Sequence, residues 1–340
     1  MSNSPARDLG WLAAAGTPRA IGAALGVAGR DSVHLHLTKS DIWHKVTSGE
    51  HTARVSRLIE ATKQRFPAVW EEIQGLAQGL DLPVDHVMAW NCRGDLLASA
   101  PDGCTTVQIP GATPTFAHNE DGLPFFHGAC FIADITPDES PGFISFCYPG
   151  SLPGHSFAVT DRGIAQAVNN LRLLDVEAGI PRMVLGRAVL AAHDLDESVS
   201  LLAGNPNSGG FHFTLAQAGR PELLSVEFGG GNCVVKEVSG PSLHTNHALR
   251  LPAAATGRQI ITKSSHDRQA RGDALVAAGE HSPLEILRDT AGPGLPIHRD
   301  APDDPDRENT LATAVMRVRK NGVEWEIYDR SAQAPLYVSK

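Results

Sequence analysis

The sequence places a cysteine where a nucleophile is more useful than a packing residue. Cys104 follows the turn-forming pair Asp102-Gly103 and precedes two threonines typical of a strand start. A thiol is a weak nucleophile until another group accepts its proton. Cleavage of the Gly103–Cys104 bond would supply such a group, because a free α-amine has an ordinary pKa of about 7.7–8.0 and would lie within reach of its own sulfur. Glycine before that bond permits the strained backbone that self-cleavage needs.

The polar residues downstream of the cysteine fit the same chemistry. Asn119 and Asp121 follow the turn segment at 110–114, so a second strand can fold back and bring Asp121 beside the amine of Cys104. Side-chain amides at Asn169 and Asn246 would suit donors to a developing oxyanion. Each residue taken alone is more typical of a loop that satisfies backbone groups, and a buried cysteine is more often inert. The hypothesis that Cys104 is a nucleophile therefore depends on these residues occurring together in one sequence.

Composition excludes several classes of partner. The chain has 340 residues, is 42% hydrophobic and carries 29 basic against 38 acidic side chains, for a net charge of −9. No basic run marks a nucleic-acid or anionic-membrane surface, so we expect small-molecule ligands. The first residues lack a signal-peptide pattern and no apolar stretch reaches membrane-spanning length, which predicts a cytoplasmic protein.

The cysteines and histidines do not form a recognisable metal motif. Five cysteines include no CxxC pair and leave an odd one over, so neither a disulfide framework nor structural zinc is indicated. The segments "HLH" (His34, His36) and "HTNH" (His244, His247) offer two ligands each without a third. We therefore expect no metal and no cofactor.

The hydrophobic patterns around these residues predict alternating blocks of helices and strands. An amphipathic segment at 54–80 predicts one long helix or two helices that meet near Pro67, followed by a short helix within 81–97. A later helical block at 181–204 contains a capping box formed by Asp194 and Glu197. We expect strands at 105–109, 143–148, 156–160, 164–169, 211–216, 223–228, 233–238, 310–318, 323–328 and 335–339, and helical patterning at 268–279 and 283–290. This order favours an α+β layered sandwich over a parallel βαβ fold.

The motifs "GCTT", "NED", "NN", "LLSVEF" and "HTNH", in this order, carry a family resemblance. Over residues 65–335 the chain resembles the acyl-coenzyme A:isopenicillin N acyltransferase family of N-terminal-nucleophile enzymes, which is related to the penicillin V acylase and choloylglycine hydrolase group. The resemblance implies a four-layer αββα sandwich. It also implies a zymogen whose small chain, residues 1–103 and mainly helical, stays associated with a large catalytic chain, residues 104–340, after autocleavage between Gly103 and Cys104.

The resemblance also implies roles for individual residues. Cys104 is similar to the nucleophile, Asp121 to the partner of its α-amine, and Asn246 to the oxyanion-hole asparagine. Further substrate or oxyanion positions fall on Asn119, His118, Asn169, Thr310 and Arg307, and Glu227 falls at a structural position. The chain departs from the family pattern at Glu120, where an aromatic residue is frequent, and at His118, where glutamine or arginine is frequent. These departures leave the polarity of the substrate pocket open.

These observations predict an amidohydrolase that attacks a linear amide or small peptide-like conjugate through Cys104 and passes the acyl group from a thioester to water. An acyltransferase that takes its acyl group from a coenzyme A thioester is the alternative. A third reading is an unprocessed, non-catalytic or metal-dependent protein of the same fold. The sequence leaves open the acyl and amine groups and whether the chain forms a homo-oligomer.

Overall fold

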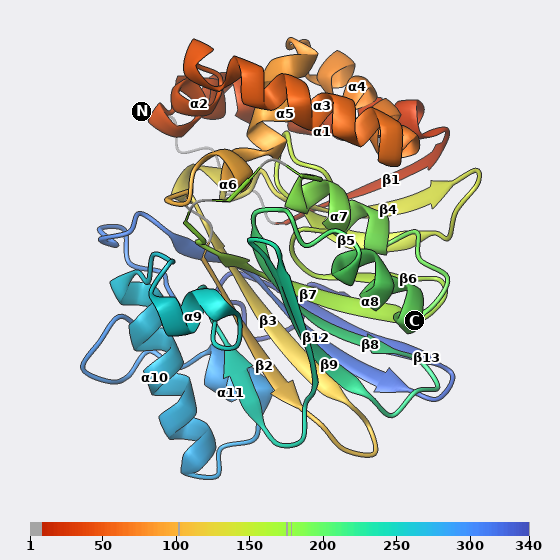
Figure 1. The fold of residues 1–340 in the computed structure, drawn as a ribbon. Helices are drawn as coiled ribbons and strands as arrows, with labels where there is room; N and C mark the ends of the chain where they lie inside the picture. Colours follow the sequence, from red (N-terminus) through yellow and green to blue (C-terminus); the bar gives the residue numbers. More distant parts are fainter. Residues whose placement is uncertain (1–8, 101–102, 175, 178, 340) are drawn as a thin grey trace, which may run out of the picture.

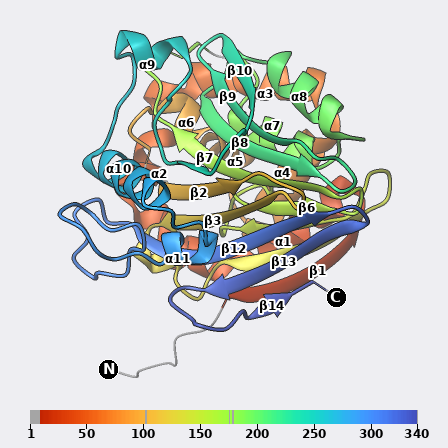
Figure 2. The same ribbon diagram turned by 90° about the horizontal axis from the view of Figure 1, so that it is seen from below.

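Two β-sheets packed face to face, with helices on both outer faces, form the four layers of an αββα sandwich (Figures 1 and 2). The computed structural model describes residues 9–100, 103–174, 176–177 and 179–339. This arrangement confirms the α+β sandwich expected from the sequence. Asp102, half of the expected Asp-Gly turn, lies outside the described residues.

The larger sheet has eight strands in the order β1-β4-β5-β6-β7-β8-β9-β10. Strand β1 pairs with β4 in parallel, whereas the other neighbours are antiparallel. The strands are β1 (Gly10–Gly16), β4 (Phe131–Pro137), β5 (Phe143–Cys147), β6 (Ala158–Thr160), β7 (Ile164–Leu171), β8 (Gly210–Gln217), β9 (Leu223–Gly229) and β10 (Asn232–Glu237).

The smaller sheet has six strands in the order β11-β2-β3-β12-β13-β14, all antiparallel. Strand β2 begins at the proposed cleavage bond, and β3 folds back beside it as the sequence predicted. The strands are β2 (Gly103–Ile109), β3 (Thr115–Gly122), β11 (Ser242–His244), β12 (Asn309–Arg319), β13 (Gly322–Asp329) and β14 (Tyr337–Val338).

The residues before β2 form mainly helices. The long amphipathic segment divides at Phe66, ahead of Pro67, as Pro67 predicted. Helices α1 and α4 approach so closely that a Cβ at Gly22 would lie 1.9 Å from the Glu72 carbonyl oxygen, so this contact requires glycine. The helices are α1 (Pro18–Leu35), α2 (Asp41–Val46), α3 (Thr52–Arg65), α4 (Pro67–Leu80), α5 (Val84–Asn91) and α6 (Arg93–Leu96).

The remaining helices lie on both sides of the sandwich. Helices α1, α7 and α8 contact the larger sheet or one another, whereas α10 and α11 cover the smaller sheet (Figure 1). At the start of α8, Asp194 accepts a hydrogen bond from the Glu197 backbone, as predicted. Among the described residues, no helix combines the length and apolar character needed to cross a bilayer. The later helices are α7 (Arg182–Val189), α8 (Leu195–Ala203), α9 (Pro252–Thr256), α10 (Lys263–Ala277) and α11 (Pro283–Leu287).

Strand β2 presents different chemistry on its two faces because successive side chains alternate. Thr106 and Gln108 face the sandwich interior, where they hydrogen-bond Asn169 and Thr214 of the larger sheet at 2.7 Å each. Val107 faces outward into the cluster beneath α11. Cys104 lies two residues before Thr106, so its side chain points to the same inward face and its thiol lies in the sandwich interior. Its backbone lies next to α10.

Candidate active site

The backbone of Cys104 is held on both sides at the start of β2. Its N–H donates to Asn246 Oδ1 at 2.9 Å, and its carbonyl oxygen accepts a bond from Arg268 Nη1 at 2.5 Å. Strand β3 supplies Glu120 as the partner directly opposite Cys104. Only 2% of Cys104 is exposed. The nucleophile predicted from sequence is therefore fixed in position and shielded from solvent in the intact chain.

The surroundings of the Cys104 sulfur favour the neutral thiol. Burial raises its pKa well above the ordinary value, and the Glu120 carboxylate raises it further. Hydrogen bonds from the Asn170 backbone and the Asn246 side chain act in the opposite direction. These two donors would stabilise negative charge on the Cys104 sulfur.

Arg268, from α10, links the nucleophile to its asparagine. It is buried and donates to the Cys104 carbonyl, to Thr105 Oγ1 at 2.7 Å and to Asn246 Oδ1 at 2.7 Å. Burial lowers its pKa, and the nearby charge of Asp121 opposes that shift. The planar guanidinium suits several fixed acceptors at once, so this residue orients both groups.

Asp121 lies beside the bond that self-cleavage would break. It is opposite Gly103 in the β2–β3 register and fully buried. Its Oδ1 accepts a hydrogen bond from Thr310 Oγ1 at 2.7 Å. Its Oδ2 has no hydrogen-bond partner among the residues that the structure describes. A buried carboxylate oxygen without a donor is costly, which makes this oxygen a candidate partner for a new cation.

The carboxyl group of Glu308 also lies next to Gly103, at the bond that self-cleavage would break. A Cβ at Gly103 would lie 2.4 Å from Glu308 Oε2, so glycine gives this group its room. Glu308 is buried and pairs with Arg299 at 2.8 Å and Arg172 at 3.4 Å. Burial raises the Glu308 pKa, whereas the two arginines oppose the shift. The Arg299 carbonyl oxygen accepts a hydrogen bond from the Thr310 N–H, and the Thr310 hydroxyl donates to Asp121. Thr310 therefore connects the Glu308–Arg299 pair to Asp121.

On the inward face, a polar chain leads away from the thiol. His118 contacts Thr106 Oγ1 through Nδ1 at 2.8 Å and Glu120 Oε2 through Nε2 at 3.0 Å. Burial lowers the His118 pKa to about 3, so its imidazole is neutral. Cys104, His118 and Glu120 each offer a metal-ligand atom, and these atoms lie within 4.8 Å of one another. Asn169 continues the chain from Thr106 to His212.

Two residues predicted for the site lie elsewhere. Asn119 points toward α11, donates to the Leu287 carbonyl and accepts from Thr313. Arg307 is exposed in a loop, with a φ of 57°, and is not among the residues that hold the Cys104 backbone. Asn119 is the register partner of Thr105, and strand alternation turns its side chain to the face opposite the Cys104 thiol.

Glu227 anchors the loop that carries Asn246. It accepts from His244 Nε2 at 2.8 Å and from the backbone N–H groups of Leu249, Arg250 and Leu251, each at 2.9 Å. Burial alone would raise its pKa, but these hydrogen bonds and the His244 charge outweigh burial and lower the pKa to about 2. The structural role expected for Glu227 is thus the fixing of the segment that follows β11.

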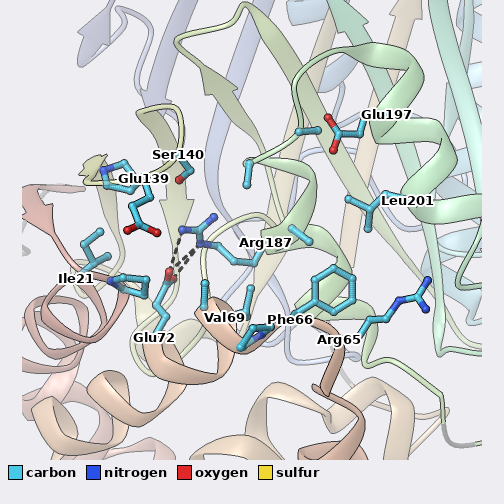
Figure 3. Close-up of a pocket in the computed structure, with 17 residues that line it drawn as sticks. Ile21, Arg65, Phe66, Val69, Glu72, Glu139, Ser140, Arg187, Glu197 and Leu201 are labelled. Carbon is cyan, nitrogen blue, oxygen red and sulfur yellow. Dashed lines mark hydrogen bonds and ion pairs between the residues drawn. The ribbon is translucent and has the colours of Figure 1, made fainter. Parts of the chain in front are cut away.

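The cavity in Figure 3 lies away from Cys104. It has a volume of about 360 Å³, and Figure 3 shows Glu72 and Arg187 paired across its floor, with Phe66 and Val69 nearby. The Arg187–Glu72 contact is 2.9 Å. None of the residues that hold Cys104 lines this cavity.

The comparison with protein families identifies the chain's relatives. The model of the acyl-coenzyme A:6-aminopenicillanic acid acyl-transferase family matches residues 109–331. The chain belongs to that family. The match covers β3, β12 and the Asn246 loop of this acyltransferase-family protein, and begins after Cys104.

Named relatives include both hydrolases and acyltransferases. The chain is 22% identical over 292 residues to the beta-alanyl-dopamine/carcinine hydrolase of Drosophila melanogaster, with 76% of each chain covered. It is 27% identical over 222 residues to the 40 kDa form of acyl-coenzyme A:6-aminopenicillanic-acid-acyltransferase of Emericella nidulans. That match covers 60% of this chain and 58% of the relative. A crystal structure of a variant conjugated bile acid hydrolase from Clostridium perfringens is 13% identical, with a TM-score of 0.41, covering 70% of this chain and 97% of that one.

Sequence reasoning missed four groups around the nucleophile. Arg268, Arg299 and Glu308 are charged residues that the fold buries, and no local motif marks them. Arg268 occupies a buried position on a polar helix. Patterns in a single sequence do not distinguish such a position from a solvent-exposed one. Asn170 contributes its backbone rather than its side chain to the thiol, so its residue type gave no indication.

Proposed function

We propose that this protein is a self-processing amidohydrolase in which Cys104 becomes an N-terminal nucleophile. The observation that carries the proposal is the buried Asp121 Oδ2, which has no donor among the described residues and belongs to the residue opposite Gly103. Cleavage of the Gly103–Cys104 bond creates an α-ammonium group near this oxygen. The α-ammonium group of Cys104 would then donate to Asp121 Oδ2, a buried carboxylate oxygen that has no donor among the described residues before cleavage.

Self-cleavage begins with attack of the Cys104 sulfur on the Gly103 carbonyl carbon. The thiol proton is transferred to the amide nitrogen as the C–N bond breaks, which gives a thioester and a free amine. Water then hydrolyses the thioester, leaving a Gly103 carboxylate and restoring the thiol. Cleavage also severs the covalent link before Cys104, and we expect this to give substrate access to a thiol that is buried in the intact chain.

Turnover follows the same chemistry with an amide substrate. The α-amine takes the thiol proton, sulfur attacks the acyl carbon, and the resulting ammonium protonates the leaving amine. Asn246 Nδ2 and the Asn170 N–H stabilise the oxyanion, since both already hydrogen-bond the sulfur region. The Arg268 cation, bonded to Asn246, opposes the effect of Asp121 on the α-amine, so the amine can take up and release its proton during turnover.

The substrate class proposed is a small N-acyl amine conjugate. The relative in Drosophila melanogaster, whose name describes hydrolysis of carcinine and beta-alanyl-dopamine, supports amide hydrolysis, because its match covers three quarters of both chains. The Emericella nidulans relative supports the second candidate, acyl transfer from a coenzyme A thioester, although the chain spans only 58% of it.

Product analysis distinguishes these two reactions. The purified protein is incubated with a panel of N-acyl amines, and separately with acyl-coenzyme A plus an acceptor amine, with Cys104→Ala as the control. Release of amine and free acid in the first set supports hydrolysis. Formation of an acyl-amine only in the second set supports transfer. Equal rates for the wild type and Cys104→Ala in either set would overturn a role for Cys104.

A further inference from the structure

On the inward face of the site, His118 Nε2 and Glu120 Oε2 lie 3.0 Å apart. Asn169 Nδ2 donates to the His244 carbonyl oxygen at 3.2 Å, so its Oδ1 must be the acceptor that faces Thr106. The single hydroxyl proton of Thr106 is committed to that oxygen. Thr106 Oγ1 therefore accepts from His118 Nδ1–H. In a neutral imidazole this leaves Nε2 with a lone pair, 3.0 Å from Glu120 Oε2.

The other oxygen of Glu120 is also oriented by a donor. Tyr148 Oη lies 2.7 Å from Glu120 Oε1, which leaves Oε2 turned toward His118. At this separation the two atoms share one proton in the metal-free protein, and one metal ion can take the place of that proton. Cys104 offers the third ligand atom of the set, within 4.8 Å of the others.

We propose that Cys104, His118 and Glu120 bind a single Zn²⁺ ion. Thiolate sulfur, imidazole nitrogen and carboxylate oxygen are the donors that zinc prefers, at about 2.3, 2.0–2.1 and 2.0–2.2 Å. Thr106 and Tyr148 supply the outer hydrogen bonds that fix ligand orientation in such sites. The three residues thus supply three of the four positions of a tetrahedral zinc site.

Binding exchanges protons for the metal without any redox change. Zn²⁺ displaces the thiol proton of Cys104 and the proton shared by His118 and Glu120, and both protons pass to solvent. The sulfur lone pair that would attack a carbonyl then binds zinc, so the ion inhibits the enzyme reversibly. The inhibitory consequence rests on the proposed function, whereas metal binding does not.

A spectroscopic titration tests the site independently of activity. The chelator-treated protein, whether one chain or two, is titrated with Co²⁺, and Zn²⁺ is then added as competitor. The expected result is a near-ultraviolet thiolate-to-cobalt charge-transfer band that saturates at one equivalent and disappears with Zn²⁺. Cys104→Ser should abolish the band, and Thr106→Val should weaken binding by about 10–100-fold.

Matched variants separate this site from adventitious binding. Cys233→Ser, which alters a half-buried thiol on β10, should leave the titration unchanged. His118→Gln, which can retain contacts to Thr106 and Glu120, should lose at least about 100-fold in affinity if its fold is intact by circular dichroism. A band that persists in Cys104→Ser or in folded His118→Gln, or the absence of any band in the wild type, overturns the proposal. Zn²⁺ should also protect the Cys104 peptide from alkylation, which provides a second reading if a variant fails to fold.

Discussion

Arg268 Nη2 donates to Asn246 Oδ1 at 2.7 Å, and the same oxygen accepts the Cys104 N–H at 2.9 Å. The Arg268 guanidinium also donates to the Cys104 carbonyl, so one arginine and one asparagine hold both ends of the proposed nucleophile. The arginine comes from α10 and the asparagine from the loop after β11. Loss of either residue should therefore affect both the backbone position of Cys104 and the proposed oxyanion donors.

Arg268→Met should destabilise the chain and slow turnover. It removes a buried charged donor from several acceptors, which typically costs at least about 1.5–3 kcal/mol of unfolding free energy. Arg268→Lys should lose less, because it keeps the charge but not the planar fork. Urea unfolding in a Cys104→Ala background keeps all variants in the same covalent state. Arg271→Met on the same helix, which removes a partly exposed pair with Asp289, should cost under about 1 kcal/mol. Equal losses at the two positions would contradict the role of Arg268.

Asn246→Ala should lower kcat by about 10²–10³, or about 3–4 kcal/mol, with little change in KM, because its amide acts mainly on the charged intermediate. The structure adds a stability cost of about 1–3 kcal/mol, since Asn246 Oδ1 also accepts from Cys104 and Arg268. Asn246→Asp separates the two effects, because it keeps the acceptor oxygen and removes the donor. Asn246→Asp also loses the bond from Asn246 Nδ2 to the Asn170 carbonyl oxygen at 3.3 Å, so we expect it to be less destabilised than Asn246→Ala and still to lose kcat. Normal kcat in both variants would remove Asn246 from the catalytic residues.

Gly103→Ala should slow self-cleavage, because a Cβ there collides with the Glu308 carboxyl group that Arg299 and Arg172 hold in place. The measurement is the fraction of uncut chain by intact mass after a fixed incubation. Gly240→Ala is the matched control, since a Cβ at that position meets no atom within 4 Å. Equal cleavage in the two variants would show that the space beside Gly103 is not required.

The pH dependence of stability should reveal Glu227. Its pKa of about 2 in the folded protein lies below the ordinary value of about 4.3, so ionised Glu227 contributes stability above pH 4.3 and loses it as the pH falls toward 2. Glu227→Gln lacks this contribution, which is on the order of 3 kcal/mol. The difference in unfolding free energy between wild type and Glu227→Gln should shrink as the pH falls from about 5 toward 2. A difference that grows on acidification would contradict the assigned hydrogen bonds.

Local patterns in the sequence predicted most of the fold, because strand alternation and the residues that start or end a helix are local properties. The helix break before Pro67 and the return of β3 beside β2 are examples. Strand β1 and helix α1 were not predicted. Strand β1 has alternating exposure but pairs in parallel with a strand distant in sequence, and α1 owes its close packing to glycines that face α4.

The candidate site was predictable only where a residue type carries its own chemistry. Cys104, Asp121 and Asn246 have such side chains, and the fold brings them together around the start of β2. Arg268 and Glu308 could not be identified, because their burial depends on how α10 and the 299–309 loop meet the sheet. Asn119 has a suitable side chain, but it points to the opposite face from the Cys104 thiol.

Self-processing at Gly103–Cys104 is tested by intact-mass analysis of freshly purified protein, with Cys104→Ala prepared in parallel. We expect two associated polypeptides in the wild type, residues 1–103 and 104–340, with cysteine at the new N-terminus. We expect a single uncut chain in Cys104→Ala, because the thiol must attack the preceding carbonyl before the bond can break. A wild-type chain that is uncut yet fully active, or a Cys104→Ala chain cut at the same bond, would contradict self-processing.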